Sequence, residues 1–109
     1  MLSVSRSAKN SSEDITYRLE GLEFEWNKSK AQSNFVKHGV TFEEAAEVFL
    51  DPFYVAGDAS ANNEEREFVL GYSLAERLLL VIHIERGVRT RIISARVATR
   101  TEQRLYEQS

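Results

Sequence analysis

The chain has 109 residues and a formal net charge of −3, with 42% hydrophobic and 28% charged residues, which is typical of one folded domain. It contains no cysteine and only two histidines, His38 and His83, so disulfides, thiolate metal ligands and a cysteine nucleophile are excluded and no metal site is expected. No apolar run has the length of a membrane span or of a signal peptide, and we expect a cytoplasmic protein with no membrane partner.

Residues 1–21 are polar and lack a sustained period, which predicts a flexible N-terminal tail, although residues 15–24 (ITYRLEGLEF) can contribute a short strand. The short apolar run FEW at 24–26 predicts the first strand. Asn27 is a good N-cap for a helix over residues 28–38. Gly39 follows two basic residues and predicts the left-handed end of that helix.

A second helix is predicted directly after the first. Thr41 and Glu44 have the spacing of a capping box, and the apolar positions from Phe42 to Phe49 follow a helical period. Asp51 and Pro52 predict its end, because the residue before a proline avoids the helical conformation.

The second half of the chain changes to the pattern of strands. Apolar runs at 53–56, 66–73, 77–85 and 89–97 predict four strands, with a polar loop at 57–65 after the first. The breaks between the later runs are short enough for hairpins, which favours a meander of antiparallel strands. Thr99 and Glu102 form another capping box and predict a helix to about Gln108. We therefore expect an α+β fold: a small antiparallel sheet with two N-terminal helices and one C-terminal helix.

Charge is distributed unevenly along this chain. Residues 21–85 carry a formal charge of −7, whereas residues 86–106 carry six arginines against Glu102 alone, a charge of +5. The C-terminal segment could therefore hold phosphate, while most of the remaining chain would repel it.

Arg91 and Arg96 flank the apolar sequence IISA on a predicted strand, where strict alternation directs their side chains to opposite faces. Each guanidinium could reach the strand end or pair with an acidic residue. Alternatively, the two could bind phosphate and stabilise the charge that develops on a phosphorane during RNA cleavage.

Other basic and aromatic residues allow two readings as well. Arg100 and Arg104 lie one helical turn apart and suit either backbone phosphates or a solvated helix face. Tyr106 could pack or stack on a base. Arg66 follows Glu64 and Glu65 and could form a surface ion pair or supply a further guanidinium to the sheet.

Three residues are candidates for moving a proton. His83 lies within the apolar run LLLVIHIE and could be a satisfied core residue or an acid–base group. Lys37 and His38 are equally explained by the end of the first helix, where cations are favoured without any role in catalysis.

Three motifs occur in a fixed order: FEWNKSK at 24–30, KHGVTFEEA at 37–45 and RIISARVATRTE at 91–102. Over residues 23–107 the chain resembles the BrnT family of bacterial type II toxins. The resemblance implies a RelE-like fold, with a BrnT-like toxin domain at 22–109. It also implies a ribonuclease that arrests translation without a metal or other cofactor. The implied partners are an RNA substrate and a BrnA-like antitoxin with a ribbon-helix-helix domain. DNA would be contacted only by the antitoxin.

Carried over position by position, the motifs place six basic residues at the functional surface: Lys37, His38, Arg66, Arg91, Arg96 and Arg100. Arginine stays protonated in proteins and cannot be the base that activates the ribose hydroxyl. That leaves His83, His38, Lys37 or a glutamate. We expect the catalytic residues to be Arg96, Arg91, Arg66, His83 and Lys37, and the substrate-binding residues to be His38, Arg100, Arg104 and Tyr106.

Val97 departs from the pattern, since many relatives carry a second arginine directly after SAR, and this thins the basic patch. A different class of function remains open: a binding module without turnover. Its arginine-rich face would dock an acidic partner or a nucleic acid.

Overall fold

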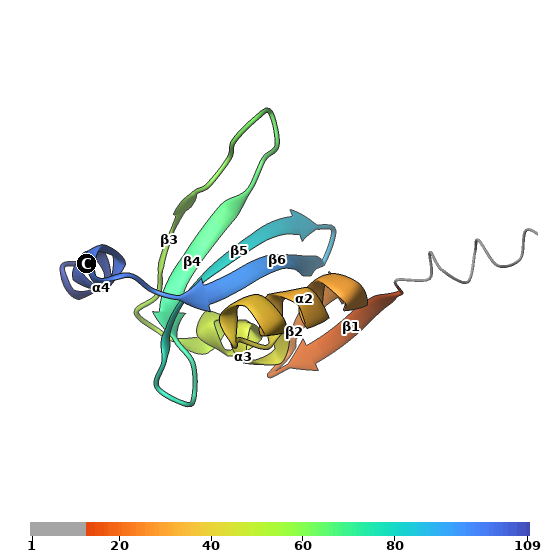
Figure 1. The fold of residues 1–109 in the computed structure, drawn as a ribbon, viewed down its shortest axis with the longest axis horizontal. Coiled ribbons are helices and arrows are strands. Elements are labelled where there is room, and N and C mark those ends of the chain that lie inside the picture. The colour runs from red at the N-terminus through yellow and green to blue at the C-terminus, as the bar shows by residue number, and fades with distance from the viewer. Residues whose placement is uncertain (1–12) are drawn as a thin grey trace, which may run out of the picture.

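The computed structural model describes residues 13–109 as a six-stranded sheet with three α-helices (Figure 1). None of the helices in this range is long and apolar enough to cross a membrane. The elements in chain order are β1 (Asp14–Leu19), β2 (Leu22–Asn27), α2 (Lys28–His38), α3 (Phe42–Glu47), the 3-10 turn η1 (Val48–Leu50), β3 (Val55–Asp58), β4 (Glu67–Tyr72), β5 (Leu78–Arg86), β6 (Arg89–Val97) and α4 (Arg100–Glu107).

The strands are arranged in the order β1-β2-β6-β5-β4-β3. β3 to β6 form the predicted antiparallel meander. The prediction of a wholly antiparallel sheet is wrong, because β2 pairs with β6 in parallel, at Phe24 with Thr90 and Glu25 with Arg91. The two helices between β2 and β3 carry the chain from the second strand of the sheet to its far edge, and the meander then returns it to β2 through β6.

The strand foreseen within residues 15–24 is present as a hairpin of two strands. All six residues of β1 pair with β2, and Glu20 and Gly21 form the turn with φ values of 49° and 83°. Such positive φ values suit a two-residue hairpin turn. Residues 14–19 therefore belong to the sheet and not to the predicted tail, whereas residues 1–12 lie outside the described residues.

The helix caps follow the sequence signals with one exception. Asn27 Oδ1 accepts from the Lys30 amide at 2.9 Å, and Gly39 ends α2 with a φ of 70°. Thr41 Oγ1 accepts from the Glu44 amide at 3.0 Å, but the predicted return bond from the Thr41 amide to the Glu44 side chain is absent. The Glu44 carboxylate instead accepts from Arg77 Nε at 3.0 Å, which ties α3 to the start of β5.

The third strand begins two residues later than the sequence pattern predicts. Asp51 Oδ1 accepts from the Phe53 amide at 2.9 Å, and its carbonyl oxygen accepts from the Tyr54 amide at 3.2 Å. These bonds hold residues 51–54 in a turn after Pro52, so the extended segment begins only at Val55.

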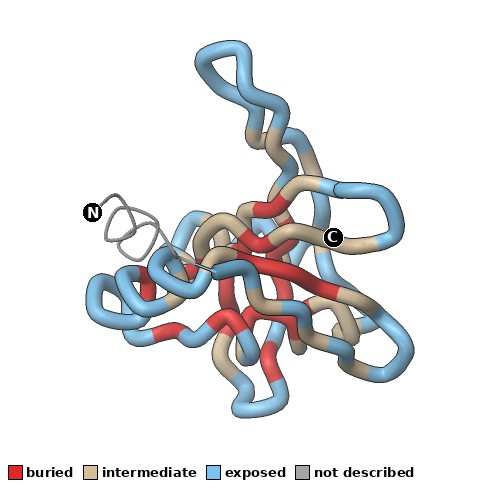
Figure 2. The backbone as a smooth tube through the Cα atoms, turned by 90° about the vertical axis from the view of Figure 1, so that its right-hand side faces the viewer, coloured by how far each residue is buried: buried red, intermediate tan, exposed pale blue. Residues whose placement is uncertain are grey.

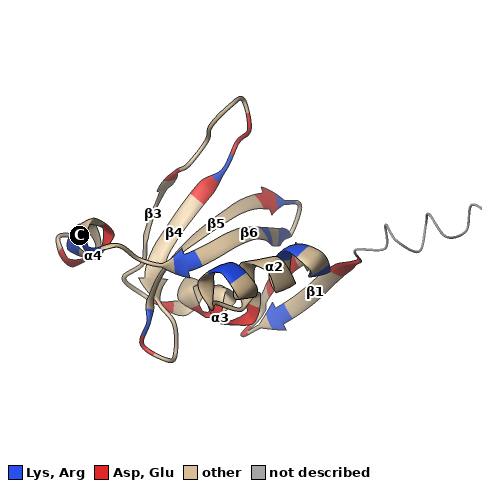
Figure 3. Ribbon diagram, in the orientation of Figure 1, with Lys and Arg blue, Asp and Glu red and all other residues tan. Residues whose placement is uncertain are grey.

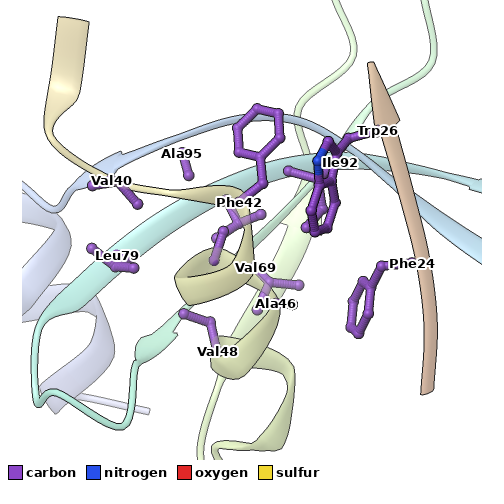
Figure 4. Packing of buried hydrophobic residues seen from close by; sticks show 12 residues of the cluster. Phe24, Trp26, Val40, Phe42, Ala46, Val48, Val69, Leu79, Ile92 and Ala95 are labelled. Carbon is purple, nitrogen blue, oxygen red and sulfur yellow. The ribbon is translucent and has the colours of Figure 1, made fainter. Parts of the chain in front are cut away.

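The core lies between one face of the sheet and the pair α2 and α3, and buried segments gather at the centre of the molecule (Figure 2). Phe24 and Trp26 of β2 point into it, and the Trp26 ring packs edge-on against Phe42 at 5.7 Å (Figure 4). We call this the covered face and the opposite one the open face. α4 stands at the end of the sheet beside β4 (Figure 1).

A register shift in β6 decides which way its arginines point. Ile92 and Ala95 both lie in the core although they are three residues apart. Ile82 pairs with Ser94 and His83 with Ile92, so Ile93 is an extra residue in a β-bulge. The bulge reverses the alternation, and Arg91 and Arg96 both lie on the open face. The prediction of opposite faces is wrong for this reason.

The edge of β6 beyond its short pairing with β2 is closed by one side chain from α2. Asn34 Nδ2 donates to the carbonyl oxygens of Ala95, at 2.9 Å, and Val40, at 3.0 Å, and its Oδ1 accepts from the Ala95 amide at 3.1 Å. The buried amide thus bonds one residue of β6 as a neighbouring strand would, and satisfies backbone groups that would otherwise be orphaned.

Candidate functional site

Arg91 lies in a network of acidic residues on the open face. Its guanidinium donates to Glu25 at 2.8 Å and to both oxygens of Asp14 at 3.1 Å. The side chains of Arg91 and Glu25 are 15% and 11% exposed. The guanidinium lowers the pKa of Asp14 below its usual value. Arg86 and Arg89 lie within 4 Å of Glu25 as well, so this cluster of arginines is largely neutralised by acids within the chain.

Arg96 lies further along the same strand and is bound by one acid. Its two terminal nitrogens donate to the two oxygens of Glu102 at 2.9 and 2.8 Å, a bidentate pair. Hydrogen bonds from Arg96 lower the pKa of Glu102, which makes this carboxylate a weak proton acceptor. The Arg96 side chain remains 38% exposed, so an anion in solution could reach it.

The C-terminal helix α4 begins beside this pair. The predicted capping box is complete: Thr99 Oγ1 accepts from the Glu102 amide at 3.2 Å, and Glu102 accepts from the Thr99 amide at 2.9 Å. Arg100 and Arg104 are exposed on this helix. The Tyr106 hydroxyl donates to Asp51 at 2.7 Å, and burial together with this bond raises the pKa of Tyr106 to about 12. Tyr106 therefore attaches α4 to Asp51 after η1 and, through an edge-on ring contact at 5.2 Å, to Tyr72 of β4.

Two sequence motifs meet at this end of the sheet. The carbonyl oxygen of Gly39, directly after Lys37 and His38, accepts from the Arg77 side chain at 3.0 Å. The carbonyl oxygen of Leu78, the residue after Arg77, accepts from the Ala98 amide at 2.9 Å. The end of α2 and the end of β6 thus flank the start of β5. We call this region, with Arg96 and α4, the α4 end.

His83 occupies a different region on the covered face. It is 3% exposed, and its ring packs edge-on against Phe49 at 5.1 Å. Burial lowers the pKa of His83, and the carboxylates of Glu85 and Glu67 partly oppose this shift. Neither ring nitrogen has a hydrogen-bond partner among the described residues. Glu67, His83 and Glu85 form the group in the described chain that could hold a metal ion.

Arg66 directly precedes Glu67, the residue of β4 that pairs with His83, and its guanidinium is bound by an acidic residue. Its guanidinium donates to Glu64 at 2.9 Å, and its side chain is 26% exposed. Arg66 lines a hollow of about 350 Å³ together with Ile84, which pairs with Arg91 across β5 and β6. Arg66 and Arg91 therefore belong to the opposite end of the sheet, which we call the hairpin end.

The predicted site residues thus divide into two groups. Arg96 pairs with Leu80 and Arg91 with Ile84, four positions apart on β5, which corresponds to roughly 13 Å. His83 faces the covered side, whereas both arginines face the open side. Figure 3 shows basic residues at both ends of β6. At the α4 end lie Arg96 on the open face, Arg100, Arg104 and Tyr106 on α4, and Lys37 and His38 in the last turn of α2, which belongs to the covered face. The hairpin end holds Arg66, Arg91 and His83.

Three residues that position these groups were not singled out from the sequence: Glu25, Asn34 and Arg77. Glu25 had a readable signal, because an acid between two large apolar residues on a short strand needs a cation when it is buried. Asn34 and Arg77 had none, since their partners are distant in sequence.

Comparison with known proteins identifies the family. Residues 26–102 match the family model of the ribonuclease toxin BrnT of type II toxin–antitoxin systems. A crystal structure of the Brucella abortus ribonuclease toxin BrnT is similar, with 27% sequence identity and a TM-score of 0.54, over 69% of this chain and 94% of that chain. A comparison with curated protein sequences gave no significant match. The order of the motifs, the mixed sheet and these similarities agree, and the chain belongs to the BrnT family of ribonuclease toxins of type II toxin–antitoxin systems.

Proposed function

We propose that this ribonuclease cuts RNA without a metal ion, at the α4 end of the sheet, and thereby blocks translation in the cytoplasm. A base removes the proton of a ribose 2′-hydroxyl, the resulting oxygen attacks the adjacent phosphorus, and the bond to the 5′-oxygen breaks. The 5′-oxygen leaves with a proton from the protonated base or from water. The products are a 2′,3′-cyclic phosphate and a 5′-hydroxyl. Negative charge grows on the phosphorane oxygens during this step, and a fixed cation beside them lowers the barrier.

The observation that carries the proposal is the bidentate Arg96–Glu102 pair at the end of β6. The capping box fixes Glu102, and Glu102 fixes the guanidinium, yet the Arg96 side chain is 38% exposed. A preorganised and accessible guanidinium suits a phosphorane better than one enclosed by acids. Arg91, with two acidic partners and 15% exposure, is assigned to the stability of the sheet in this proposal.

Arg96 needs a separate proton acceptor. His83 is unsuited to this role because its ring is buried, with only 3% of the residue exposed. His38 is exposed in the last turn of α2, whose end flanks the α4 end, and a neutral imidazole has a nitrogen that can accept a proton. We assign His38 as the base, Lys37 as a phosphate contact, and Arg100 and Arg104 as contacts to the RNA backbone.

A ribonuclease toxin of a type II system has a cognate antitoxin and an RNA substrate. For this chain we propose an antitoxin with a ribbon-helix-helix domain. In the toxin–antitoxin complex, this domain would be the part that binds DNA. Open reading frames next to the gene test this part, since a short ribbon-helix-helix protein is expected there.

The central test is RNA cleavage in the presence of a chelator. Wild type should cut, and Arg96→Ala should reduce the rate by about 10²- to 10³-fold, the usual loss when one stabilising donor is removed. Arg18→Ala is a matched control, because Arg18 is a 71% exposed arginine on β1 and should leave the rate unchanged. His38→Gln should also reduce the rate, and binding of uncut RNA should persist.

Two results would contradict the proposal. Cleavage by wild type that stops with chelator, although the chelated protein stays folded, would exclude the metal-free mechanism. RNA that stays intact with folded wild type, while Arg96→Ala weakens RNA binding, would instead support the binding module without turnover.

A further inference from the structure

We propose that Glu67, His83 and Glu85 bind one divalent transition-metal ion on the covered face, at the hairpin end of β4 and β5. The site is separate from the RNA-cleaving region proposed above and would connect the two strands. It is inferred from an unsatisfied buried imidazole that two carboxylates approach.

The first observation is the state of the His83 ring. Both of its nitrogens are buried, and neither makes a well-aligned hydrogen bond within residues 13–109; the nearest acceptor, Glu85 Oε2, lies 3.3 Å from Nδ1. The His83 side chain is only 4% exposed. A buried polar group without a partner is unfavourable, so native structures nearly always provide one. Phe49 packs edge-on against the ring, and the two nitrogens face different carboxylates, Nδ1 that of Glu85 and Nε2 that of Glu67.

The second observation is the geometry of the carboxylates. Glu67 pairs with His83 across the β4–β5 ladder, and Glu85 lies two residues further along β5, on the same face. Glu67 Oε1 is 4.0 Å from His83 Nε2, and Glu85 Oε2 is 3.3 Å from Nδ1. One ligand atom from each residue lies within 4.8 Å of the others.

A bound ion would need these atoms to be closer by a small amount. Ligands at bond lengths of about 2.1 Å are separated by about 3–3.5 Å from one another. Because the two carboxylates lie beside different ring nitrogens, one of them must rotate towards the nitrogen that binds the ion. The side chains of Glu67 and Glu85 are 60% and 55% exposed, so this rotation does not disturb the core. A single nitrogen of His83 would take part, and water would fill the remaining positions.

The donor set defines the class of metal. One imidazole nitrogen with two carboxylate oxygens suits Zn²⁺, Co²⁺, Mn²⁺ or Fe²⁺, whereas Mg²⁺ and Ca²⁺ favour oxygen ligands alone. Two carboxylates balance the charge of a divalent ion. Asp58 and Glu65 line the adjoining hollow and add to the negative potential. Arg66, the cation that lines the same hollow, is paired with Glu64 at 2.9 Å.

The test is metal binding by the full-length, tag-free protein, since a histidine tag would bind the same ions. After chelation and dialysis, Zn²⁺ is titrated by calorimetry, and Co²⁺ is titrated by its visible absorption. We expect one equivalent to bind and the melting temperature to rise. His83→Gln and Glu67→Gln should each weaken binding by at least about tenfold.

Matched controls separate this site from general surface binding. His38→Gln removes the other histidine of the chain and should bind the ion as wild type does. Glu64→Gln removes a neighbouring exposed acid and should do the same. If His83→Gln does not fold, Glu67→Gln, a change at an exposed side chain, decides the question.

The proposal is overturned if wild type binds neither Zn²⁺ nor Co²⁺, or if Glu67→Gln and folded His83→Gln bind as tightly as wild type. An equal loss in His38→Gln would also overturn it, because the ion would then be held elsewhere. RNA cleavage is not the readout, so this result and that of the cleavage test are independent.

Discussion

Arg91 and Arg96 lie on the same strand and on the same face of the sheet, but their surroundings differ. Arg91 is enclosed by Asp14 and Glu25 and is 15% exposed, whereas Arg96 has the single partner Glu102 and is 38% exposed. Glu25 lies between the core residues Phe24 and Trp26, so its carboxylate is buried and requires a cation. The same residue type therefore stabilises the fold at the hairpin end and remains accessible to an anion at the α4 end.

The largest effect on stability should come from Arg91→Ala. This change leaves Glu25 largely buried without its closest cation and should lower the free energy of unfolding by about 3 kcal/mol. Arg18→Ala, on an exposed pair with Glu23, should cost about 0–1 kcal/mol. Denaturant unfolding measures both.

RNA cleavage by Arg91→Ala and Arg96→Ala tests whether the two arginines have different roles. Below its melting temperature, Arg91→Ala should retain RNA cleavage, and Arg96→Ala should retain stability but lose cleavage. If folded Arg91→Ala is as inactive as Arg96→Ala, the division of roles between the two arginines is wrong.

Asn34→Asp tests the part of β6 between these two ends. The substitution replaces the donor of two hydrogen bonds, to the carbonyl oxygens of Val40 and Ala95, by an oxygen. Two buried carbonyl groups then lack a partner, and we expect a loss of about 2–3 kcal/mol. Asn34→Ala should cost less, because it introduces no repulsion. Equal stability of Asn34→Asp and wild type would show that the bonds of this amide contribute little.

Thr99→Ala should have a smaller effect at the α4 end. The N-cap of α4 is lost, which typically costs about 1 kcal/mol. Glu102 also loses part of the arrangement that holds it against Arg96, so cleavage should fall while melting changes little. Thr99→Ser retains the cap and serves as the control. A cleavage rate unaffected by Thr99→Ala would mean that Arg96 does not depend on the cap.

The smallest effect concerns pH. The folded-state pKa values of Asp14 and Glu102 lie below the unfolded values of about 4, because Arg91 and Arg96 bind the charged forms. Both carboxylates therefore stabilise the protein above about pH 4, and this contribution is lost as the pH falls through the folded-state values.

Chemical unfolding at several pH values compares the two ends. Asp14→Asn should be less stable than wild type at pH 7, and the difference should shrink towards pH 3. The same should hold for Glu102→Gln. A difference that stays constant over this range would contradict a role for the carboxylate charge.

Much of the local structure follows from short sequence signals. Asn27, Gly39 and Thr99 mark helix boundaries because each satisfies backbone groups of its own neighbourhood. The four later strands follow from their apolar runs and short breaks. The motifs around KHG and SAR indicated the family, which the comparisons confirm. The parallel pairing of β2 with β6 carried no such signal, since its partners are more than sixty residues apart.

The α+β class, most helix boundaries and the family can be predicted from the sequence, because these depend on neighbouring residues and on ordered motifs. The tertiary structure alone decided what each arginine touches. A bulge at Ile93 brings Arg91 and Arg96 to one face. The Glu44 carboxylate accepts from Arg77 and not, as predicted, from the Thr41 amide. Both outcomes arise from contacts between distant segments, where burial and charge pairing outweigh the local pattern.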